Sequence, residues 1–260
     1  MADCSVTNRP YISLILPAFN EAATIGKTVE EAIRYFSRRG WTYQIIVAAD
    51  GEDATRDIVS KMAAVNPNLH VIGSRERLGK GRGIRMAVAL ATGEIIGYAD
   101  ADNKVPIEEF DKFEPCFAQE FDIAIGSRGL AQSTILRAQP WYRRVGSRTF
   151  AVVLHAIVGL REFVDTQCGF KFFRRGVAQK IFAAQQIDGY MFDIEVLAMA
   201  QRLGCRVAQI PVVWRDDGDS RLQLVRGNLQ NGRDLFRIRA SLRSLDRSEQ
   251  TIAAKGAAQG

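Results

Sequence analysis

Short apolar runs alternate with amphipathic segments along the first 126 residues of the chain. Runs that are rich in Ile and Val, or bounded by Gly and Asp, predict strands over 11–16, 43–49, 69–73, 95–99 and 121–125. Helical patterns fill the gaps, and the clearest has Ile25, Val29, Ala32, Ile33 and Phe36 at near-helical spacing. This alternation predicts an α/β fold whose mostly parallel sheet is covered by helices, with ligands at the carboxyl ends of its strands.

The pattern changes after Ser127. It predicts a polar loop, a long helix around 141–160, a strand over 167–173, a helix over about 192–203 and a strand over 206–213. A further helical segment, 222–245, has an apolar side that is formed by Leu222, Val225, Leu229, Phe236, Leu242 and Leu245. Because no Pro-rich or Ser-rich linker divides the chain, we expect a single domain over 1–245. Its nucleotide-facing half is expected at about 11–126, its acceptor-facing half at 127–245 and a flexible tail at 246–260.

The composition is that of an ordinary soluble globule, since 47% of the 260 residues are hydrophobic and 25% are charged. The longest nearly uncharged apolar run, 149–160, has 12 residues, fewer than the roughly 20 that span a bilayer. The chain begins without the pattern of a secretory signal and its four cysteines are scattered, so we expect a cytoplasmic protein. A net charge of +6 favours an anionic partner: nucleic acid, an anionic membrane surface or a phosphorylated small molecule.

The strongest local signal lies at 97–103, where an apolar strand leads directly into Asp100 and Asp102. Two carboxylates at the end of a strand can converge on one hard cation, and Mg²⁺ or Mn²⁺ completes its shell with phosphate oxygens. The competing interpretation is an acidic turn, in which Asp102 or Asn103 caps a helix that begins near Pro106.

Two more predicted strands end in polar groups at the same edge of the sheet. The first ends in 17–21 (Pro-Ala-Phe-Asn-Glu) and the second in 50–53 (Asp-Gly-Glu-Asp), which favours a binding cleft, although Asn20 and Asp53 also suit helix caps. The segment 79–83 (Gly-Lys-Gly-Arg-Gly) offers backbone N–H groups and cations to a phosphate. It matches neither the Walker loop nor the dinucleotide-binding fingerprint, and a plain glycine-rich turn is the alternative.

Seven segments that occur in order give the chain a family resemblance. They are 17–21, 49–53, 78–81 (Leu-Gly-Lys-Gly), the pair Asp100 and Asp102, 126–128 (Gly-Ser-Arg), 165–171 (Asp-Thr-Gln-Cys-Gly-Phe-Lys) and 192–195 (Phe-Asp-Ile-Glu). With this set the chain resembles, over roughly 11–243, the family 2 inverting glycosyltransferases of the Rossmann-like GT-A fold. Within that family it is most similar to the dolichyl- or polyprenyl-phosphate glucosyl and mannosyl synthases.

The resemblance implies a nucleotide-sugar site in the first half of the chain. The residues around the base and ribose would be Pro17, Ala18, Asn20, Glu21 and Asp50, with Lys80 near the nucleotide or its phosphates. Asp100, Ala101 and Asp102 would also contact the nucleotide. Asp100 and Asp102 would be the metal pair, with Asp102 the more direct, catalytic ligand of Mg²⁺ or Mn²⁺. Ala49 and Glu52 depart from the Asp-Asp-Gly-Ser run of many members, which leaves the identity of the base open.

The second half is expected to select the acceptor, which in these synthases is a lipid monophosphate whose own oxygen attacks the anomeric carbon. The side chains implied in phosphate binding are Arg128, Arg143, Arg144, Ser147 and, as a clamp on the diphosphate, Arg221. A solvated basic helix face is the alternative for Arg143, Arg144 and Arg128, and a surface arginine in a flexible acidic loop is the alternative for Arg221.

Asp193 and Glu195 lie where other members place an acidic residue near the reacting centre. With a hydroxyl acceptor, Asp193 is the predicted general base, because a neutral alcohol attacks poorly without proton removal. With a phosphate acceptor it only orients groups. Capping of the helix that starts there is the competing interpretation.

We therefore expect an enzyme that transfers a hexose, glucose before mannose, from UDP-glucose or GDP-mannose to a polyprenyl or dolichyl phosphate. A second hypothesis keeps the donor but has a soluble hydroxyl acceptor. A third is a basic nonenzymatic protein that binds membrane or nucleic acid. Its arginines lack interleaved aromatic residues, so no nucleic-acid partner is expected. Peripheral contact with the inner face of a membrane, through 150–160 and the C-terminal helix, agrees with the first hypothesis, and a homodimer is one assembly left open.

Overall fold

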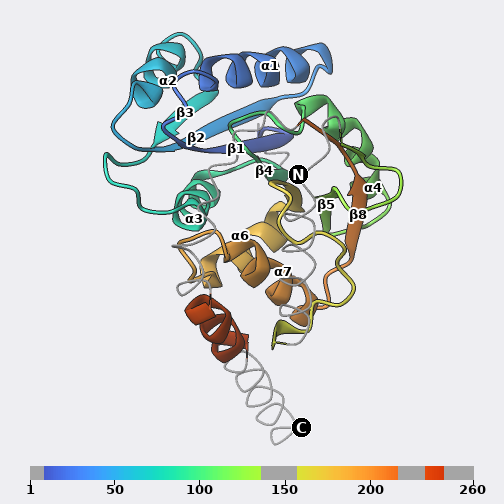
Figure 1. The fold of residues 1–260 in the computed structure, drawn as a ribbon. Helices are drawn as coiled ribbons and strands as arrows, with labels where there is room; N and C mark the ends of the chain where they lie inside the picture. The colour runs from blue at the N-terminus through green and yellow to red at the C-terminus, as the bar shows by residue number, and fades with distance from the viewer. Residues whose placement is uncertain (1–8, 136–156, 216–231, 243–260) are drawn as a thin grey trace, which may run out of the picture.

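The computed structural model describes residues 9–135, 157–215 and 232–242. Its centre is a seven-stranded sheet with the strand order β3-β2-β1-β4-β7-β5-β8 (Figure 1). These strands are β1 (Ile12–Phe19), β2 (Tyr43–Asp50), β3 (Leu69–Ile72), β4 (Ile95–Ala99), β5 (Ile123–Ser127), β7 (Phe170–Arg174) and β8 (Val207–Pro211). Neighbours run parallel except β7, which is antiparallel to both β4 and β5. A smaller sheet pairs β6 (Thr134–Ile135) with β9 (Val213–Trp214).

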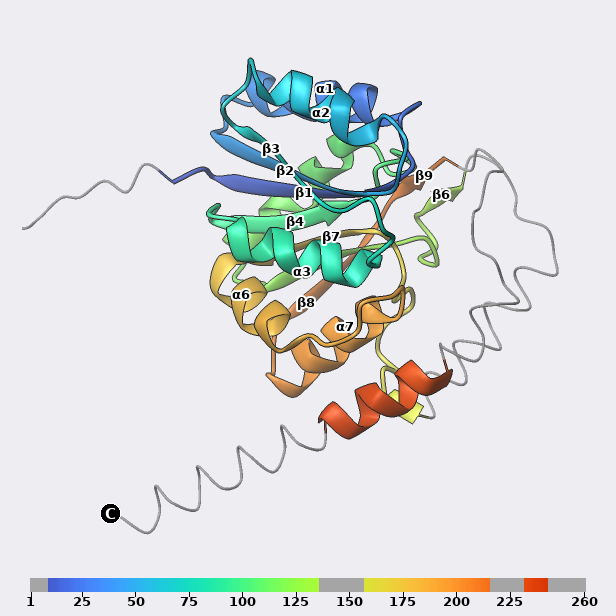
Figure 2. The ribbon, with the colours of Figure 1, turned by 90° about the vertical axis from the view of Figure 1, so that its left-hand side faces the viewer.

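Helices cover both faces of the large sheet (Figure 2). One face carries α1 (Ile25–Arg38), α2 (Thr55–Ala63), η1 (Ile107–Lys112) and α4 (Glu114–Ala118), and the other carries α3 (Lys80–Leu90), α6 (Arg175–Ala184) and α7 (Phe192–Arg202). A helix over 232–242 packs on the α7 side through Leu235, Ile238 and Leu242. Each face therefore has its own hydrophobic layer.

The sequence of β1 explains how one strand serves both layers. Ile12, Leu14 and Leu16 pack into the layer under α1, whereas Ile15 packs into the layer under α3 and α7. Successive side chains of a strand point to opposite faces, and a strand with both faces covered is apolar almost throughout. The predicted α/β fold with its single domain and mostly parallel sheet is confirmed.

The predicted C-terminal helix is wrong in one respect. Phe236, which was expected on the apolar side, is 67% exposed, while Leu235, Ile238 and Leu242 are buried. The parts of this predicted helix at 222–231 and 243–245 lie outside the described residues, as do 141–156 of the helix predicted around 141–160. In the ranges that are described, no helix is long and apolar enough to span a membrane.

Candidate active site

Three strands that lie side by side, β2, β1 and β4, end at the same edge of the sheet. Asn20 follows β1, Asp50 ends β2 and Asp100 follows β4. The Asn20 N–H donates to the Asp50 carbonyl oxygen at 3.4 Å. Gly51 has φ of +117°, and a Cβ there would lie 2.1 Å from Asn20 Oδ1, so glycine allows the ends of β1 and β2 to approach this closely. The sheet thus brings together polar groups from separate segments of the sequence.

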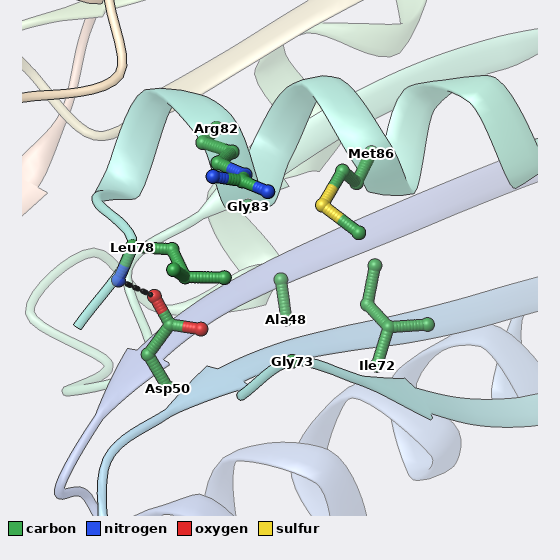
Figure 3. Close-up of a pocket in the computed structure, with 8 residues that line it drawn as sticks. All are labelled: Ala48, Asp50, Ile72, Gly73, Leu78, Arg82, Gly83 and Met86. Atoms are coloured by element: carbon green, nitrogen blue, oxygen red, sulfur yellow. Dashed lines mark hydrogen bonds between the residues drawn. The ribbon is translucent and has the colours of Figure 1, made fainter. Parts of the chain in front are cut away.

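Asp50 fastens the loop between β3 and α3. Its Oδ1 accepts the Ser74 N–H at 3.2 Å, and its Oδ2 accepts the Leu78 N–H at 2.8 Å. A hollow lies between this loop, the ends of β2 and β3, and α3, with Asp50 and Arg82 on opposite sides of it (Figure 3). Its other lining residues are small or apolar: Ala48, Ile72, Gly73, Leu78, Gly83 and Met86. The hollow has a volume of about 10 Å³, which is room for about one water molecule.

The other residues predicted for the nucleotide lie on and just after β1. Pro17 is half-buried and Ala18 is buried, each paired with an alanine of β2. Glu21 accepts a hydrogen bond from the Thr24 hydroxyl at 3.0 Å. Asp53 accepts the N–H groups of Thr55 and Ala22, both at 3.0 Å. It lies one residue before Ala54, the N-cap residue of α2, so it contacts the start of that helix without occupying the capping position. The assignment of Pro17, Ala18 and Glu21 to nucleotide binding stays a prediction.

Asp100 and Asp102 follow β4 at this edge, and each is paired with a lysine. Lys80 Nζ lies 2.6 Å from Asp100 Oδ1, and Lys104 Nζ lies 2.8 Å from Asp102 Oδ2. Burial lowers the pKa of Lys80, but the Asp100 and Asp193 carboxylates outweigh it and hold that pKa above its usual value. Ala101 is buried between the two aspartates, where its carbonyl accepts the Thr28 hydroxyl at 2.9 Å.

Gly169, just before β7, leaves room for the Asp100 carboxylate. A Cβ on Gly169 would lie 2.0 Å from Asp100 Oδ2, and the Asp100 N–H donates to the Gly169 carbonyl at 3.0 Å. The carboxylate therefore occupies a cradle that a larger side chain would fill.

Asp100 and Asp102 fit a hard divalent cation that is completed by other oxygens. Their side chains are 39% and 30% exposed, so both carboxylates are open to solvent. Within the described ranges, no three His, Cys, Asp or Glu side chains are placed to hold a metal. The aspartates thus offer two carboxylates, which suits Mg²⁺ or Mn²⁺ that keeps waters and takes phosphate oxygens.

A buried ion pair joins α7 to β7 and β4. Lys171 Nζ donates to Asp193 Oδ1 at 2.5 Å and to the Cys168 carbonyl at 2.8 Å, and the Tyr98 hydroxyl donates to the same Asp193 oxygen at 2.5 Å. Lys171 is 0% exposed and Asp193 is 3% exposed. Burial, and then the Asp193 carboxylate, raise the pKa of Tyr98 well above its usual value. Asp193 as a general base stays a prediction.

Arg128, predicted to hold the acceptor phosphate, grips a carboxylate of the chain itself. Its Nε and Nη2 donate to the two oxygens of Asp165 at 2.7 and 2.9 Å, and its guanidinium lies 5.7 Å from the centre of the Trp214 ring. Burial raises the pKa of Asp165, but Arg128 outweighs it and lowers that pKa to about 2. Four other predicted phosphate-binding residues lie outside the described ranges: Arg143, Arg144, Ser147 and Arg221.

Several residues around the site were not assigned a role from the sequence: Tyr98, Lys104, Asp165, Gly169 and Lys171. A signal existed for one of them, because Lys171 is a lone charge in the apolar strand Phe-Lys-Phe-Phe, and such a charge requires a buried partner when both faces of the strand are covered. Lys104 gave no comparable signal, since a lysine in a polar turn is normally solvated.

A mostly parallel sheet flanked by helices, with aspartates gathered at the carboxyl ends of its strands, is the architecture of GT-A glycosyltransferases. Residues 13–182 match the family described as Glycosyl transferase family 2. The chain belongs to this family and is a glycosyltransferase.

Two curated relatives are named for the same activity. A dolichyl-phosphate beta-glucosyltransferase of Trichomonas vaginalis is 30% identical over 239 residues, which cover 88% of this chain and 70% of the relative. The dolichyl-phosphate beta-glucosyltransferase of Drosophila melanogaster is 31% identical over 242 residues, covering 87% of this chain and 74% of the relative.

Solved structures with the same fold bind nucleotide-sugars. Glucosyl-3-phosphoglycerate synthase from Mycobacterium tuberculosis, in complex with Mn²⁺, UDP-glucose and phosphoglyceric acid, matches with a TM-score of 0.58 at 21% identity, over 91% of this chain and 79% of that one. The mannosyltransferase PcManGT from Pyrobaculum calidifontis, in complex with GDP-Man and Mn²⁺, matches with a TM-score of 0.54 at 21% identity, over 83% and 59% of the two chains. At these identities the likeness shows the fold.

Proposed function

We propose that this glycosyltransferase transfers a hexose, glucose in preference to mannose, from a nucleotide-sugar to a polyprenyl or dolichyl phosphate. The preference for glucose and for a lipid phosphate is supported by the two relatives, which are named dolichyl-phosphate beta-glucosyltransferases. The structural neighbours hold UDP-glucose or GDP-Man together with Mn²⁺, which supports a nucleotide-sugar donor and a divalent metal.

The donor would lie along the edge formed by β2, β1 and β4. The base and ribose would lie at the end of β2 beside Asp50, with Asn20 and Glu21 at the adjacent end of β1. Lys80 is a half-buried cation suited to the phosphates. Asp100 and Asp102 would hold Mg²⁺ or Mn²⁺, which when bound neutralises the charge that develops on the departing nucleoside diphosphate.

The buried environment of Asp193 is the structural observation that supports a phosphate acceptor. A general base must reach the proton that it removes, yet Asp193 is 3% exposed and its Oδ1 accepts hydrogen bonds from both Lys171 and Tyr98. A phosphate monoester is largely ionised at neutral pH, with a second pKa near 6, and so needs no base. This geometry favours a phosphate acceptor over the hydroxyl acceptor of the second hypothesis.

The reaction then balances without a proton transfer to the protein. An oxygen of the acceptor phosphate forms a bond to the anomeric carbon while the bond from that carbon to the nucleoside diphosphate oxygen breaks. A single displacement of this kind inverts the anomeric configuration. The products are the glycosyl lipid phosphate and the nucleoside diphosphate.

Transfer assays with radiolabelled UDP-glucose and GDP-mannose, with and without Mg²⁺ or Mn²⁺, test this proposal. We expect a short polyprenyl phosphate to be glycosylated, mainly from UDP-glucose, and the matching polyprenol to be inert. Asp102→Ala should abolish metal-dependent turnover without unfolding the protein. Asp57 is an exposed aspartate of α2, and Asp57→Ala should retain metal-dependent turnover. Transfer to a soluble hydroxyl acceptor with none to the lipid phosphate would overturn the proposal.

We also propose that the enzyme works in peripheral contact with a membrane, where a lipid phosphate resides. The outer side of the helix over 232–242 carries the exposed aromatic Phe236 beside the exposed Arg233, Arg237 and Arg239. An aromatic group among cations suits an interface with anionic lipids.

A further inference from the structure

Both aspartates of the candidate metal pair are engaged by lysines that the fold holds in place. The side chains of Lys80 and Lys104 are 17% and 15% exposed, less than the aspartates that they contact. The lysine side chains are therefore more sheltered than the aspartate side chains. With two carboxylates and two ammonium groups, these two ion pairs together carry no net charge.

The backbone fixes each lysine. Lys80 begins α3, and the next residue, Gly81, donates its N–H to the Asp188 carbonyl at 2.8 Å. Lys104 donates its N–H to Asp102 Oδ1 at 3.3 Å, and its carbonyl accepts the Arg215 N–H at 2.8 Å. Both lysines thus extend toward the aspartates from backbone segments that hydrogen bonds hold in place. In this they differ from surface lysines, whose ion pairs are weakened by the side-chain entropy that is lost when they form.

These contacts set a condition for metal binding. A divalent cation that takes an oxygen from each aspartate competes with two ammonium groups already at 2.6 and 2.8 Å. A neutral cluster offers such a cation little net Coulomb attraction, and hard cations are held mainly by anionic oxygen ligands. A nucleoside diphosphate changes this balance, because it adds negative charge at the same sheet edge and gives the ammonium groups new acceptors.

We propose that Lys80 and Lys104 are counter-ions of the Asp100 and Asp102 pair, which make the divalent cation bind together with the nucleoside diphosphate and only weakly before it. This inference rests on the proposed nucleotide-sugar donor. It makes Lys104 a positioning residue for the metal pair. By linkage, the metal must tighten nucleotide binding by the same factor by which the nucleotide tightens metal binding.

Mn²⁺ binding to the full chain tests the inference without turnover. Water-proton relaxation enhancement distinguishes protein-bound Mn²⁺ from Mn²⁺ chelated by free nucleotide, and the titration is run alone, with UDP and with GDP. For the unmodified chain we expect the nucleotide to tighten Mn²⁺ binding by about tenfold or more, within the range of such couplings. Lys104→Met should bind Mn²⁺ alone several-fold more tightly, and the gain from nucleotide should shrink.

Lys112→Met is the matched control, because Lys112 Nζ also lies 2.6 Å from a carboxylate, that of Glu109, but on η1. It should bind Mn²⁺ like the unmodified chain. Folded Lys104→Met and Lys104→Gln proteins that bind Mn²⁺ alone no more tightly than the unmodified chain would overturn the inference. If neither variant folds, equal Mn²⁺ affinity of the unmodified chain with and without UDP and GDP would overturn it. A different result would contradict the proposed function: no hexose transfer to polyprenyl phosphate, although Mn²⁺ and the nucleotide still tighten each other's binding.

Discussion

Lys171 Nζ and Asp193 Oδ1 lie 2.5 Å apart, and the two side chains are 0% and 4% exposed. The pair connects β7 to α7, and the Tyr98 hydroxyl brings β4 to the same carboxylate oxygen. Because both charged groups are buried, each is stabilised by the other. Removal of one partner of such a buried pair typically costs about 3–5 kcal/mol of stability. The contact thus holds β7 and α7 in place against β4, the strand that leads into Asp100.

This relationship predicts that Asp193 positions groups and does not remove a proton. Asp193→Asn preserves the shape and can still accept a hydrogen bond, so we expect kcat for transfer to polyprenyl phosphate to fall less than about tenfold, with an unchanged pH profile. A lost general base typically costs about 10²–10⁴-fold. Rates between pH 5 and 9, with thermal melting as the check on folding, distinguish the outcomes. A loss above a hundredfold in folded protein, with a flattened pH profile, would reinstate Asp193 as a base.

Gly169 provides a second test of the site, because it contacts the predicted metal pair without contributing a ligand. In Gly169→Ala the new methyl group would lie 2.0 Å from Asp100 Oδ2, so the carboxylate must move. We expect kcat/KM to fall at least tenfold, with a higher Mn²⁺ concentration needed for half-maximal rate.

The matched control is Gly176→Ala in α6, where a Cβ meets no atom within 4 Å. Alanine is more favourable than glycine in a helix by about 1 kcal/mol. It should retain activity and melt at the same or a higher temperature. Normal metal dependence in Gly169→Ala would show that the position of Asp100 is not critical.

The ion pair of Arg128 and Asp165 predicts a specific acid dependence of stability. The pKa of Asp165 is about 2 in the folded protein, below the value near 3.9 of an unfolded aspartate, so its contribution is complete above pH 4 and is lost as the pH falls toward 2. The pair should contribute about 2–3 kcal/mol to unfolding free energy through this difference. The unfolding free energy of Asp165→Asn, measured in urea, should therefore be lower than that of the unmodified chain at pH 5. This difference in unfolding free energy should shrink by pH 2.

A surface pair provides the comparison. Glu120 lies 3.5 Å from Arg206, with side chains that are 87% and 54% exposed, so Glu120→Gln should change stability by less than about 1 kcal/mol at either pH. A difference between Asp165→Asn and the unmodified chain that stays constant from pH 5 to pH 2 would contradict the assignment of the low pKa.

The fold was predictable because its signals are local. Apolar runs mark the strands, the spacing from Ile25 to Phe36 marks α1, and the rule that ligands bind at the carboxyl ends of parallel strands brings Asp50 and Asp100 to one edge. The reversed direction of β7 was not predictable, because it depends on which strands it pairs with.

The interior of the site was less predictable for a similar reason. Lys171 and Asp193 are 22 residues apart in sequence, and only the packing of α7 against the sheet brings them together. Arg128 and Asp165 likewise meet through folding, over a separation of 37 residues. Contacts of this kind leave no pattern in the sequence. Strands do leave a pattern, and the residues at their ends can be located from it.

The exposed side of the helix over 232–242 predicts how the enzyme reaches a lipid acceptor. Burial of a phenylalanine side chain is worth about 1.5–3 kcal/mol, so Phe236→Ser should weaken partitioning to anionic liposomes about tenfold or more, as measured by flotation at low salt. Val65→Ser is the control, since Val65 is 86% exposed just beyond α2, on the opposite face of the sheet. An equal loss in both variants, or no flotation of the unmodified chain, would remove this helix from the membrane contact.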